Sequence, residues 1–456
     1  MQRETLGSRL GFILLSAGCA IGVGNVWKFP YMAGSNGGAI FVILYLLFLL
    51  IMGIPVMTME FAVGRGSRKS PARMYHELAP NDKKWRLHSY AAVAGNYILM
   101  MFYTSVSGWL LYYFVSTASG KLSGLDPTAV AGYFDNLLAS PVTLIICTFI
   151  VIFIGFFVCS FSLQGGLEKI TKFMMIALLF LMIILAINSI FLKGGSEGLK
   201  FYLLPDMSKV KEVGIINVIT GAMSQAFFTL SLGIGSMAIF GSYISKDRSL
   251  LGESVNVAVL DTFVALCSGL IIFPACFAYN VQPNAGPPLI FITLPNIFNN
   301  IPLGRLWGTL FFLFLCFAAL STVFAVFENI IACCMDLFNW SRKKACLINA
   351  ILMPVLSLPC ILGSNILSAF NFPGDSNGFL AIEDFTVSYL LLPLGSLAFV
   401  LFCVSRYGWG WKNFVAEANE GKGLKVAKWM RGYLTYVLPV IILILFGMGV
   451  YNYFKG

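Results

Sequence analysis

The chain has 456 residues, of which 58% are hydrophobic and only 11% are charged, and its mean hydropathy is +0.84. Because soluble domains carry about 25% charged residues, this composition excludes an ordinary soluble protein. The net charge of +10 does not indicate a nucleic-acid-binding protein, since the Lys and Arg residues punctuate apolar segments instead of forming a patch. The 11 Cys lie mostly inside apolar runs, and the two His, His76 and His88, lie in a polar loop, so no metal centre built from Cys or His is predicted.

Apolar stretches follow one another along the whole chain. A membrane-spanning helix needs about 20 apolar residues, and the sequence predicts eleven of them, near residues 9–36, 38–66, 87–117, 141–160, 166–193, 216–245, 252–282, 303–338, 345–362, 378–404 and 430–454. With a cytoplasmic N-terminus, most of the 30 Lys and Arg residues fall in cytoplasmic segments, as the positive-inside rule requires, and the odd number of spans places the C-terminus outside. No long linker occurs, so residues 1–456 are predicted to form a single transmembrane domain of the plasma (inner) membrane, surrounded by the lipid bilayer.

Two of the predicted helices carry a Gly-x-Gly in mid-membrane, at residues 22–24 of the first and 233–235 of the sixth. Each Gly weakens a helix by roughly 1 kcal/mol relative to Ala, and unwound backbone survives in hydrocarbon only where it lines a protein-enclosed cavity. Close helix packing through small residues is the alternative for either segment taken alone. Two such segments, five spans apart, favour a transporter built from two inverted five-helix repeats, residues 9–193 and 216–404, with 430–454 as a peripheral helix. In such breaks, exposed carbonyls can replace the water shell of a sodium ion, and half-helix N-termini attract a carboxylate.

Charged side chains inside the predicted spans are few and costly. The candidates for a functional role are Lys28, Glu60, Asp261, Glu328, Asp336 and Asp384. Such residues usually mark a transport pathway or an ion pair. Asp261 favours a sodium ligand or a charge-compensating carboxylate, with a structural hydrogen bond to a neighbouring helix as the alternative. Glu60 favours a supporting role, in which its carboxylate accepts backbone N–H groups of an unwound segment. The hydroxyls of Ser321 and Thr322 can bond back to their own helix, so alone they indicate little.

Several longer motifs together resemble those of the neurotransmitter:sodium symporter family and of the bacterial amino acid transporters within it. The resemblance spans residues 3 to about 404, and its motifs are Arg3 with Arg9-Leu10-Gly11, GVGNVWKFPY at 22–31, NGGA at 36–39, GIP at 53–55 with Glu60, FY at 102–103 with GW at 108–109, and QAFFTLSLG at 225–233. It implies an all-α membrane protein with the leucine-transporter fold, in which ten core helices form two inverted repeats and helices 1 and 6 are unwound. Many relatives have a twelfth helix, and the eleven spans predicted here resemble the short bacterial members.

The resemblance also implies two sodium sites and a substrate pocket. The first sodium site would use the Ala20 carbonyl and the side chains of Asn25, Thr229 and Asp261, completed by the carboxylate of the substrate. The second would use uncharged oxygens, which suit a hard monovalent cation: the carbonyls of Gly18, Ile21 and Ala318 and the hydroxyls of Ser321 and Thr322. The substrate pocket would be lined by Cys19, Ala20, Val23, Gly24, Leu99, Tyr103, Phe228, Thr229, Ser231, Ile234, Thr322 and Val326. Of these, Tyr103 would hold the substrate carboxylate and Phe228 would form the lid.

Departures from the family pattern narrow the expected substrate. Position 22 is Gly where amine-carrying relatives have Asp, which favours an amino acid over an amine. Asp261 stands where the bacterial leucine transporter has Asn, and Ala265 stands where it has Glu. Chloride-dependent relatives have neither acid and recruit an anion, so Asp261 predicts transport without chloride. The far end of the pocket is apolar, which favours a neutral, hydrophobic or aromatic L-amino acid; it comprises Leu99, Phe228, Ile234, Val323 and Val326.

The resemblance implies a gate on each side of the pocket. The outer gate would pair Lys28 with Asp384 where relatives pair Arg with Asp, and it is weaker because Lys lacks the bidentate fork of Arg. On the inner side, Arg3 would pair with Asp336, and Tyr243 would contact Glu328, which offers Arg3 a second acidic partner. Leu6 replaces a Trp that relatives carry after the Arg, which changes the packing of the inner gate.

The sequence thus predicts a sodium-coupled symporter that works by alternating access, with two sodium sites, an amino acid as its small-molecule substrate, and no need for chloride or an organic cofactor. A proton-coupled carrier, with Asp261 or Glu328 as the protonation site, and a substrate-gated receptor or channel on the same fold are the alternatives. No HExxH or Gly-x-Ser-x-Gly occurs, so neither an enzyme nor a catalytic residue is predicted. No nucleic-acid partner is expected, and the oligomeric state is not indicated.

Overall fold

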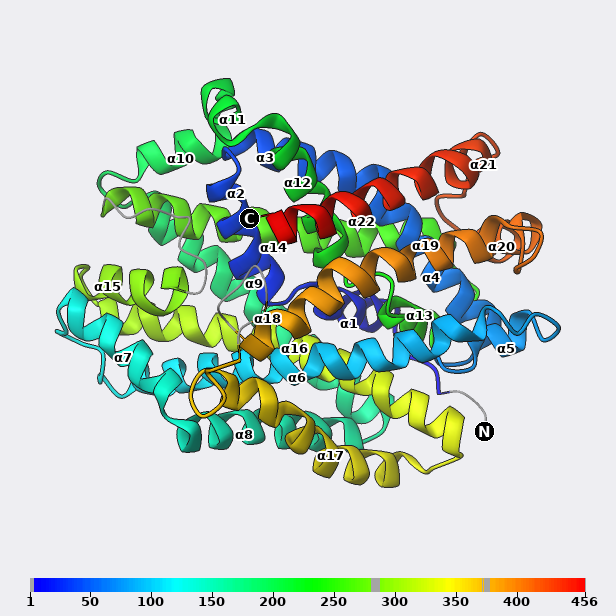
Figure 1. Ribbon diagram of the computed structural model, residues 1–456, viewed down its shortest axis with the longest axis horizontal. Coiled ribbons are helices and arrows are strands. Elements are labelled where there is room, and N and C mark those ends of the chain that lie inside the picture. Colours follow the sequence, from blue (N-terminus) through cyan, green and yellow to red (C-terminus); the bar gives the residue numbers. More distant parts are fainter. Residues whose placement is uncertain (1–3, 280–287, 371, 373–377, 456) are drawn as a thin grey trace.

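Helices account for nearly all of the protein in the computed structural model, which describes residues 4–279, 288–370, 372 and 378–455 (Figure 1). No β-strand occurs within these residues, although Arg248 and Lys422 form an isolated β-bridge. Nine helices of the described chain are long and apolar enough to cross a membrane: α3–η2–α4 (Ala39–Ser67), α6 (Arg86–Ala118), α8 (Pro141–Ser160), η3–α9 (Leu163–Ile190), α14 (Leu250–Ala278), α16 (Gly304–Phe338), α17 (Arg342–Gly363), α18–η5–α19 (Gly378–Val404) and α21–η6–α22 (Met430–Lys455). Each corresponds to a predicted span, and residues 280–282 of the predicted seventh span lie outside the described residues.

Some of these spans contain a π-helical turn, which divides them into separately labelled parts. The turns are η2 (Leu49–Gly53), η3 (Leu163–Glu168), η5 (Thr386–Leu391) and η6 (Tyr433–Val437). The α-helical parts beside them are α3 (Ala39–Phe48), α4 (Ile54–Ser67), α9 (Lys169–Ile190), α18 (Gly378–Phe385), α19 (Leu392–Val404), α21 (Met430–Gly432) and α22 (Leu438–Lys455).

The first and sixth predicted spans are broken. In the first, α1 (Arg9–Ala20) is followed by η1 (Gly24–Lys28) and α2 (Phe29–Ser35), and the two halves are bent by 56°. In the sixth, α12 (Ile215–Thr229) and α13 (Ser236–Gly241) are separated by residues 230–235, and neither helix alone is long enough to span a bilayer. The eleven predicted spans therefore correspond to nine continuous and two broken helices in the described part of the chain.

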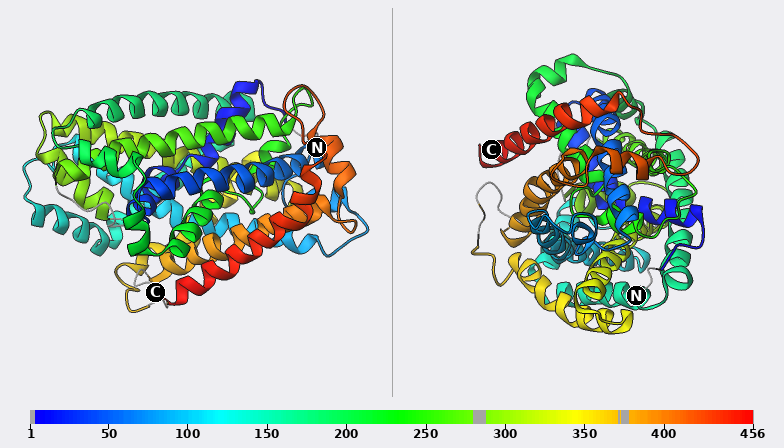
Figure 2. Two further views of the ribbon diagram at one scale, coloured as in Figure 1. Left: turned by 90° about the horizontal axis from the view of Figure 1, so that it is seen from above. Right: turned by 90° about the vertical axis from the view of Figure 1, so that its right-hand side faces the viewer.

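Shorter helices cover the two ends of the molecule. In Figure 1, α5 (Met74–Leu78) and α20 (Trp411–Ala418) lie at the end where the N-terminus is found. The opposite end carries α7 (Pro127–Ala139), α10 (Ser196–Leu203), α11 (Met207–Val213), η4 (Leu289–Thr293) and α15 (Leu294–Asn299). Both views of Figure 2 place α22 at the periphery, as predicted for the eleventh span.

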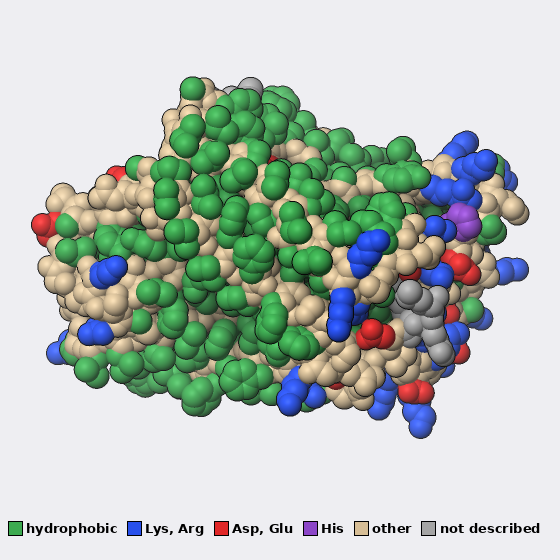
Figure 3. All heavy atoms as spheres, turned by 90° about the horizontal axis from the view of Figure 1, so that it is seen from below, with side chains coloured by type: hydrophobic (Ala, Val, Ile, Leu, Met, Phe, Trp, Pro, Cys, Tyr) green, Lys and Arg blue, Asp and Glu red, His purple; other side chains and the backbone are tan. Residues whose placement is uncertain are grey.

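An apolar belt crosses the middle of the molecule on the face that Figure 3 shows. Figure 3 shows hydrophobic side chains over the central part of the surface, while Lys and Arg gather mainly at the end that carries α5 and α20. Large exposed side chains on the membrane-length helices α8, α9 and α17 include Phe153, Phe157, Phe173, Phe180 and Ile351, which are between 51% and 69% exposed. Exposed Phe in such numbers is unfavourable in water but suits the hydrocarbon core of a bilayer. The fold is that of an integral membrane protein.

Glycines allow the broken sixth helix to pack closely against its neighbour. A Cβ on Gly64 of α4 would collide with the carbonyl oxygen of Ala238 on α13, and one on Gly241 would collide with the carbonyl oxygen of Phe61. Small residues of this kind let helix backbones approach each other in a membrane. On the other side of the core, α6 and α16 pack along each other. These contacts hold the two helix breaks between α4, α6, α14 and α16.

Candidate functional site

Side chains from distant helices satisfy the backbone at the first break. The N–H of Gly22 donates to Asn25 Oδ1 at 3.2 Å, and the N–H of Val23 donates to the hydroxyl of Tyr103, on α6, at 3.0 Å. A Cβ at position 22 would collide with that same Tyr103 hydroxyl, so a larger residue there would displace the side chain of Tyr103. The break is therefore stabilised by α6, because the Tyr103 hydroxyl accepts a backbone N–H that has no partner within its own helix.

The second break is held in the same way by three side chains. Ser231, Gly233 and Gly235 have φ of 51°, 100° and 75°, so the chain is left-handed at alternate residues. The N–H of Gly233 donates to Glu60 Oε1 at 2.5 Å, which is the hydrogen bond that the sequence predicts for Glu60. The Gly233 carbonyl lies 2.9 Å from His88 Nε2, and the Ile234 carbonyl accepts from Asn96 Nδ2 at 2.9 Å.

His88 and Asn96 were not predicted to lie here. The placement of His88 in a polar loop is wrong, because His88 belongs to the first turns of α6 and is partly buried. The contact between His88 and Gly233 could not be predicted from the sequence. Every residue has a backbone carbonyl, so residue types do not reveal which carbonyl a side chain binds. The signal that could have indicated these contacts is the recurrence of polar residues, every one or two turns, along one face of an apolar helix.

A carboxylate from α14 gathers three neutral groups beside both breaks. Asp261 is fully buried, and its Oδ1 accepts from Asn25 Nδ2 at 2.8 Å. Its Oδ2 accepts from the hydroxyls of Thr229, at 2.9 Å, and Tyr45, at 3.4 Å. None of these partners carries a positive charge, and a buried carboxylate is costly without one. The predicted residues Asn25, Thr229 and Asp261 thus lie together at a place that favours a cation, and Ala20 lines the cavity next to them.

A second group of oxygens converges between α1 and α16. The hydroxyl of Thr322 lies 3.2 Å from the Gly18 carbonyl, 3.3 Å from that of Ile21 and 3.4 Å from that of Ala318. The Ser321 hydroxyl lies 2.9 Å from the Ala318 carbonyl and 3.4 Å from that of Ile21. A hydroxyl has a single hydrogen and can satisfy only one carbonyl at a time. Two hydroxyls among three carbonyls therefore leave oxygen lone pairs without a donor, and uncharged oxygens of this kind suit a hard cation.

A cavity lies next to these two groups: Thr322 of the second group lines it, and so do Gly24 and Phe228, the sequence neighbours of Asn25 and Thr229. It is lined by Cys19, Ala20, Gly22, Gly24, Leu99, Tyr103, Phe228, Ser231, Ile234, Thr322, Val387 and Leu392. Nine of the predicted substrate-pocket residues are among them. Val23, Thr229 and Val326 are not in this lining, while Gly22, Val387 and Leu392 are lining residues that were not predicted. The last two come from η5 and α19, whose continuous apolar sequence does not distinguish a pocket wall from core packing.

Lys28, on the side predicted to be outer, makes two contacts beside the cavity. Its Nζ lies 4.0 Å from Asp384 Oδ1, and the same Nζ lies 3.7 Å from the ring centroid of Phe228. Phe228 in turn covers Gly24, where a Cβ would come within 2.7 Å of the ring. The predicted ion pair is thus long, and a cation–π contact supplements it.

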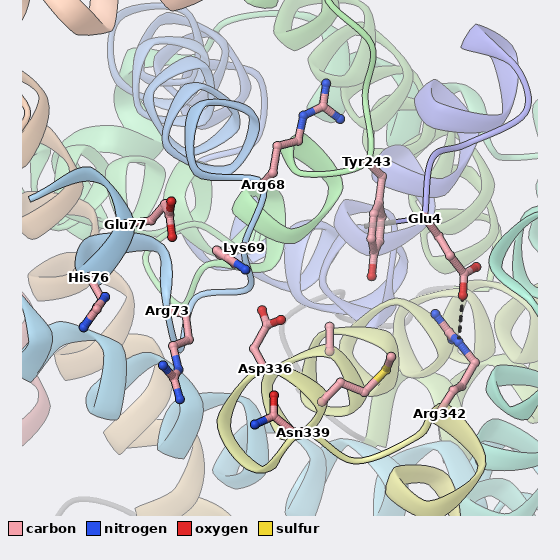
Figure 4. Close-up of a pocket in the computed structure, with 12 residues that line it drawn as sticks. Glu4, Arg68, Lys69, Arg73, His76, Glu77, Tyr243, Asp336, Asn339 and Arg342 are labelled. Atoms are coloured by element: carbon pink, nitrogen blue, oxygen red, sulfur yellow. Dashed lines mark ion pairs between the residues drawn. The ribbon is translucent and has the colours of Figure 1, made fainter. Parts of the chain in front are cut away.

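A larger, polar cavity of about 550 Å³ lies on the side predicted to be inner (Figure 4). At its edge the hydroxyl of Tyr243 donates to Glu328 Oε1 at 2.6 Å, as expected. Arg342 also binds Glu328, through both carboxylate oxygens at 2.7 and 2.9 Å, and its Nε lies 3.5 Å from Glu4 Oε1. The sequence predicted that Arg3 pairs with Asp336 and has Glu328 as a second acidic partner, but Arg3 lies outside the described residues. The base that binds Glu328 in the described chain, Arg342, was not predicted. Asp336, the predicted partner of Arg3, accepts from the N–H of Ser70 at 2.7 Å.

Leu6, which replaces the expected Trp, is partly buried against the core, and its N–H donates to the Tyr243 carbonyl at 3.3 Å. The N-terminal segment is therefore attached to the end of the broken sixth helix at this position.

Comparison with known proteins gives consistent matches over the whole chain. A sequence model described as the sodium:neurotransmitter symporter family matches residues 3–126 and 136–455. The uncharacterized sodium-dependent transporter YhdH of Bacillus subtilis is 34% identical over 96% of both chains. The uncharacterized sodium-dependent transporter MJ1319 of Methanocaldococcus jannaschii is 32% identical over 97% of this chain and 89% of its own length. A crystal structure of MhsT in complex with L-phenylalanine has 37% sequence identity and a TM-score of 0.87, covering 97% of this chain and 99% of that one.

Proposed function

Because the chain belongs to the sodium:neurotransmitter symporter family, we propose that it uses a sodium gradient to carry neutral, hydrophobic or aromatic L-amino acids. It is a sodium-dependent membrane transporter and not an enzyme. The observation that carries the proposal is the position of the cavity beside two oxygen-rich groups. One consists of the side chains of Asn25, Thr229 and Asp261, and the other includes backbone carbonyls at the end of α1, where the first helix breaks.

An amino acid fits the polar end of this cavity. Gly22 leaves the site without a carboxylate of its own at that end, while the Tyr103 hydroxyl is available beside the first break. A substrate carboxylate there receives the Tyr103 hydroxyl and the positive end of a half-helix. The same carboxylate completes the coordination of a sodium ion held by Asn25, Thr229 and Asp261, which couples the binding of the ion to that of the substrate. To bind such an ion through its oxygen, the Asn25 amide has to turn over, because its Nδ2 donates to Thr229 and Asp261 and its Oδ1 accepts from the Gly22 N–H.

The opposite end of the cavity selects the side chain. Leu99, Ile234, Val387 and Leu392 line it, and no charged residue is among the lining residues of the described chain. A charged substrate side chain would lose its hydration without compensation, whereas an apolar one gains about 25 cal/mol per Å² of buried surface. The related MhsT has been solved with L-phenylalanine, in line with this substrate class.

We propose that two sodium ions bind, the second among the carbonyls and hydroxyls around Thr322. Asp261 supplies a fixed negative charge, and Tyr45 and Thr229 already donate to it, so transport proceeds without chloride. Binding of sodium and substrate closes Lys28 and Asp384 over Phe228, and release follows when the inner contacts around Glu328 and Asp336 open. The charged end with α5 and α20 faces the cytoplasm, which places the N-terminus inside and the C-terminus outside.

A thermal-shift experiment on the purified protein tests the site directly. Sodium chloride and sodium gluconate are each expected to raise the melting temperature, and L-leucine, L-phenylalanine or L-tryptophan to raise it further only when sodium is present. Potassium salts are the control. A shift by an amino acid that is equally large in potassium would contradict sodium coupling, and one that requires chloride would contradict the role of Asp261.

A further inference from the structure

One face of α6 runs along both helix breaks. His88, Asn96, Leu99 and Tyr103 lie at helical spacing, so they share this face. Tyr103 holds the first break, Leu99 lines the cavity, and Asn96 and His88 bind successive carbonyls of the second break. His88 is the member of this stripe that lies furthest from the cavity and has no part in the proposed ion and substrate contacts.

The partners of His88 determine which ring nitrogen carries the hydrogen. The Gly233 carbonyl can only accept, so Nε2, at 2.9 Å from it, is the protonated nitrogen and donates. Nδ1 is then an acceptor, and the hydroxyl of Tyr75 donates to it at 2.7 Å. Tyr75 is fully buried on α5, and Phe399 packs edge-on against the imidazole with centroids 5.0 Å apart. Tyr75 and Phe399 therefore fix the orientation of the imidazole ring that binds the Gly233 carbonyl.

The peptide at Gly233 is fixed in turn. Its N–H is bound by Glu60 from α4, and its carbonyl is bound by His88 from α6. With φ of 100°, a Cβ here would collide with the carbonyl oxygen of Leu392, so the segment cannot shift toward α19. The next residue, Ile234, is 1% exposed and forms part of the cavity wall at the side-chain end.

We propose that His88 is a positioning residue for substrate selectivity: by holding the Gly233 carbonyl, it fixes Ile234 and so limits the size of side chain that the cavity accepts. The proposal rests on the proposed function, because it concerns the same cavity. His88 does not touch the substrate. It acts through one hydrogen bond to the backbone, so its loss lets Ile234 retreat and favours larger side chains over smaller ones.

Substitutions at this position separate the hydrogen bond from mere packing. The amide nitrogen of Gln in His88→Gln reaches about as far as Nε2, whereas that of Asn in His88→Asn reaches only as far as Nδ1. His88→Ala removes both nitrogens. The other histidine, His76, is exposed on α5, and His76→Ala is the matched control. Uptake of L-leucine and L-tryptophan by each full-length variant in proteoliposomes, at a range of sodium concentrations, gives kcat/KM for both probes.

The ratio of kcat/KM for L-tryptophan to that for L-leucine is expected to rise about three- to tenfold in H88A and H88N, the factor that one hydrogen bond of ordinary net strength represents. The ratio in H88Q and H76A stays within about twofold of the parent, and the sodium concentration for half-maximal uptake is unchanged in all four. An equal loss for both amino acids in H88A, or an H88N variant that matches the parent while H88Q does not, would overturn the proposal.

Hydrogen exchange of the protein without substrate tests the positioning separately. Peptides that cover residues 230–236 are expected to exchange faster in H88A and H88N than in the parent and H88Q. If the parent transports neither amino acid but this pattern holds, the proposed substrate class is wrong and the positioning role stands. Equal exchange in H88A and the parent would overturn the positioning role even if transport is as proposed.

Discussion

Asp261 combines complete burial with three hydrogen-bond donors that are all uncharged, namely Asn25, Thr229 and Tyr45. A carboxylate in this situation is stabilised when a cation binds beside it. Asp261→Asn keeps the shape but removes the charge, so we expect the sodium concentration for half-maximal uptake in gluconate medium to rise at least tenfold.

Chloride distinguishes the charge of Asp261 from its hydrogen bonds. Since Tyr45 and Thr229 retain their hydroxyls in D261N, chloride is expected to restore part of the lost sodium affinity in the variant and to leave the parent unaffected. Sodium activation curves in chloride and gluconate media measure this. A D261N variant that behaves like the parent in both media would show that the carboxylate has no part in ion binding.

Thr322 offers a second residue-level test, because its hydroxyl lies within 3.4 Å of three carbonyls from two helices. Thr322→Val replaces the hydroxyl by a methyl group of similar size, which cannot coordinate a cation. We expect the sodium-dependent rise in melting temperature to fall by at least half. Thr309→Val is the matched control, since Thr309 lies on the same helix, α16, and bonds only within its own turn, to the Arg305 carbonyl. Equal effects of the two substitutions would argue against a sodium site at Thr322.

At the scale of elements, the contact between α4 and α13 decides how the broken sixth helix is held. Gly64→Ala places a Cβ against the Ala238 carbonyl, and overpacking of this kind costs about 1–3 kcal/mol. The melting temperature in detergent is therefore expected to fall. Gly132→Ala in α7 is the control, because nothing lies within 4 Å of its Cβ position, and alanine there is expected to leave the melting temperature unchanged or raise it. A G64A protein as stable as the parent would mean that the two helices are not in close contact.

The helices themselves were largely predictable from the sequence. Apolar length located the spans to within a few residues, and the Gly-x-Gly pairs located both breaks, since mid-membrane glycine is a local signal. The sixth span was predicted to extend to residue 245, whereas α13 ends at Gly241. Short helices such as α5 and α20 were not predicted, because segments of that length carry too few residues for a periodic pattern to stand out.

Site residues that belong to a recognisable motif were predictable from the sequence, whereas residues that bind a backbone atom were not. Asn25, Thr229 and Asp261 were predicted as one group, and they lie in hydrogen-bond contact. By contrast, the contact of His88 with a backbone carbonyl was not predicted. The ion pair of Arg342 was not predicted either, because Arg342 was considered only as one of the positive charges that orient the protein in the membrane. Pairing of this kind depends on how α6, α16 and α17 pack, which no single segment encodes. Binding of sodium and substrate by the predicted residues stays a prediction.

At the scale of the whole molecule, we propose that closure of the inner side depends on a buried ion pair. Glu328 is fully buried and Arg342 is its cationic partner, with Tyr243 and Glu4 attached to the two ends of the pair. Arg342→Gln leaves the carboxylate buried without a cation, which typically costs 3–5 kcal/mol. We expect uptake to fall at least tenfold and the melting temperature to drop.

The double substitution R342Q with E328Q removes both charges and is expected to recover much of the lost stability, because two neutral amides can hydrogen-bond to each other. Melting temperatures of the single and double variants make the comparison. If the double variant is no more stable than R342Q, the ion pair is not what holds this region closed.

Sodium-driven flux is the property of the whole molecule that joins the two oxygen groups, the cavity and the two gates. The most direct test is uptake of radiolabelled L-phenylalanine into proteoliposomes that contain the purified protein, with chloride replaced by gluconate throughout. An inward sodium gradient is expected to drive accumulation above the external concentration, and sodium ionophores to abolish it, while a proton gradient in potassium medium drives none. Accumulation that is independent of sodium, or that a proton gradient alone supports, would contradict sodium-coupled symport.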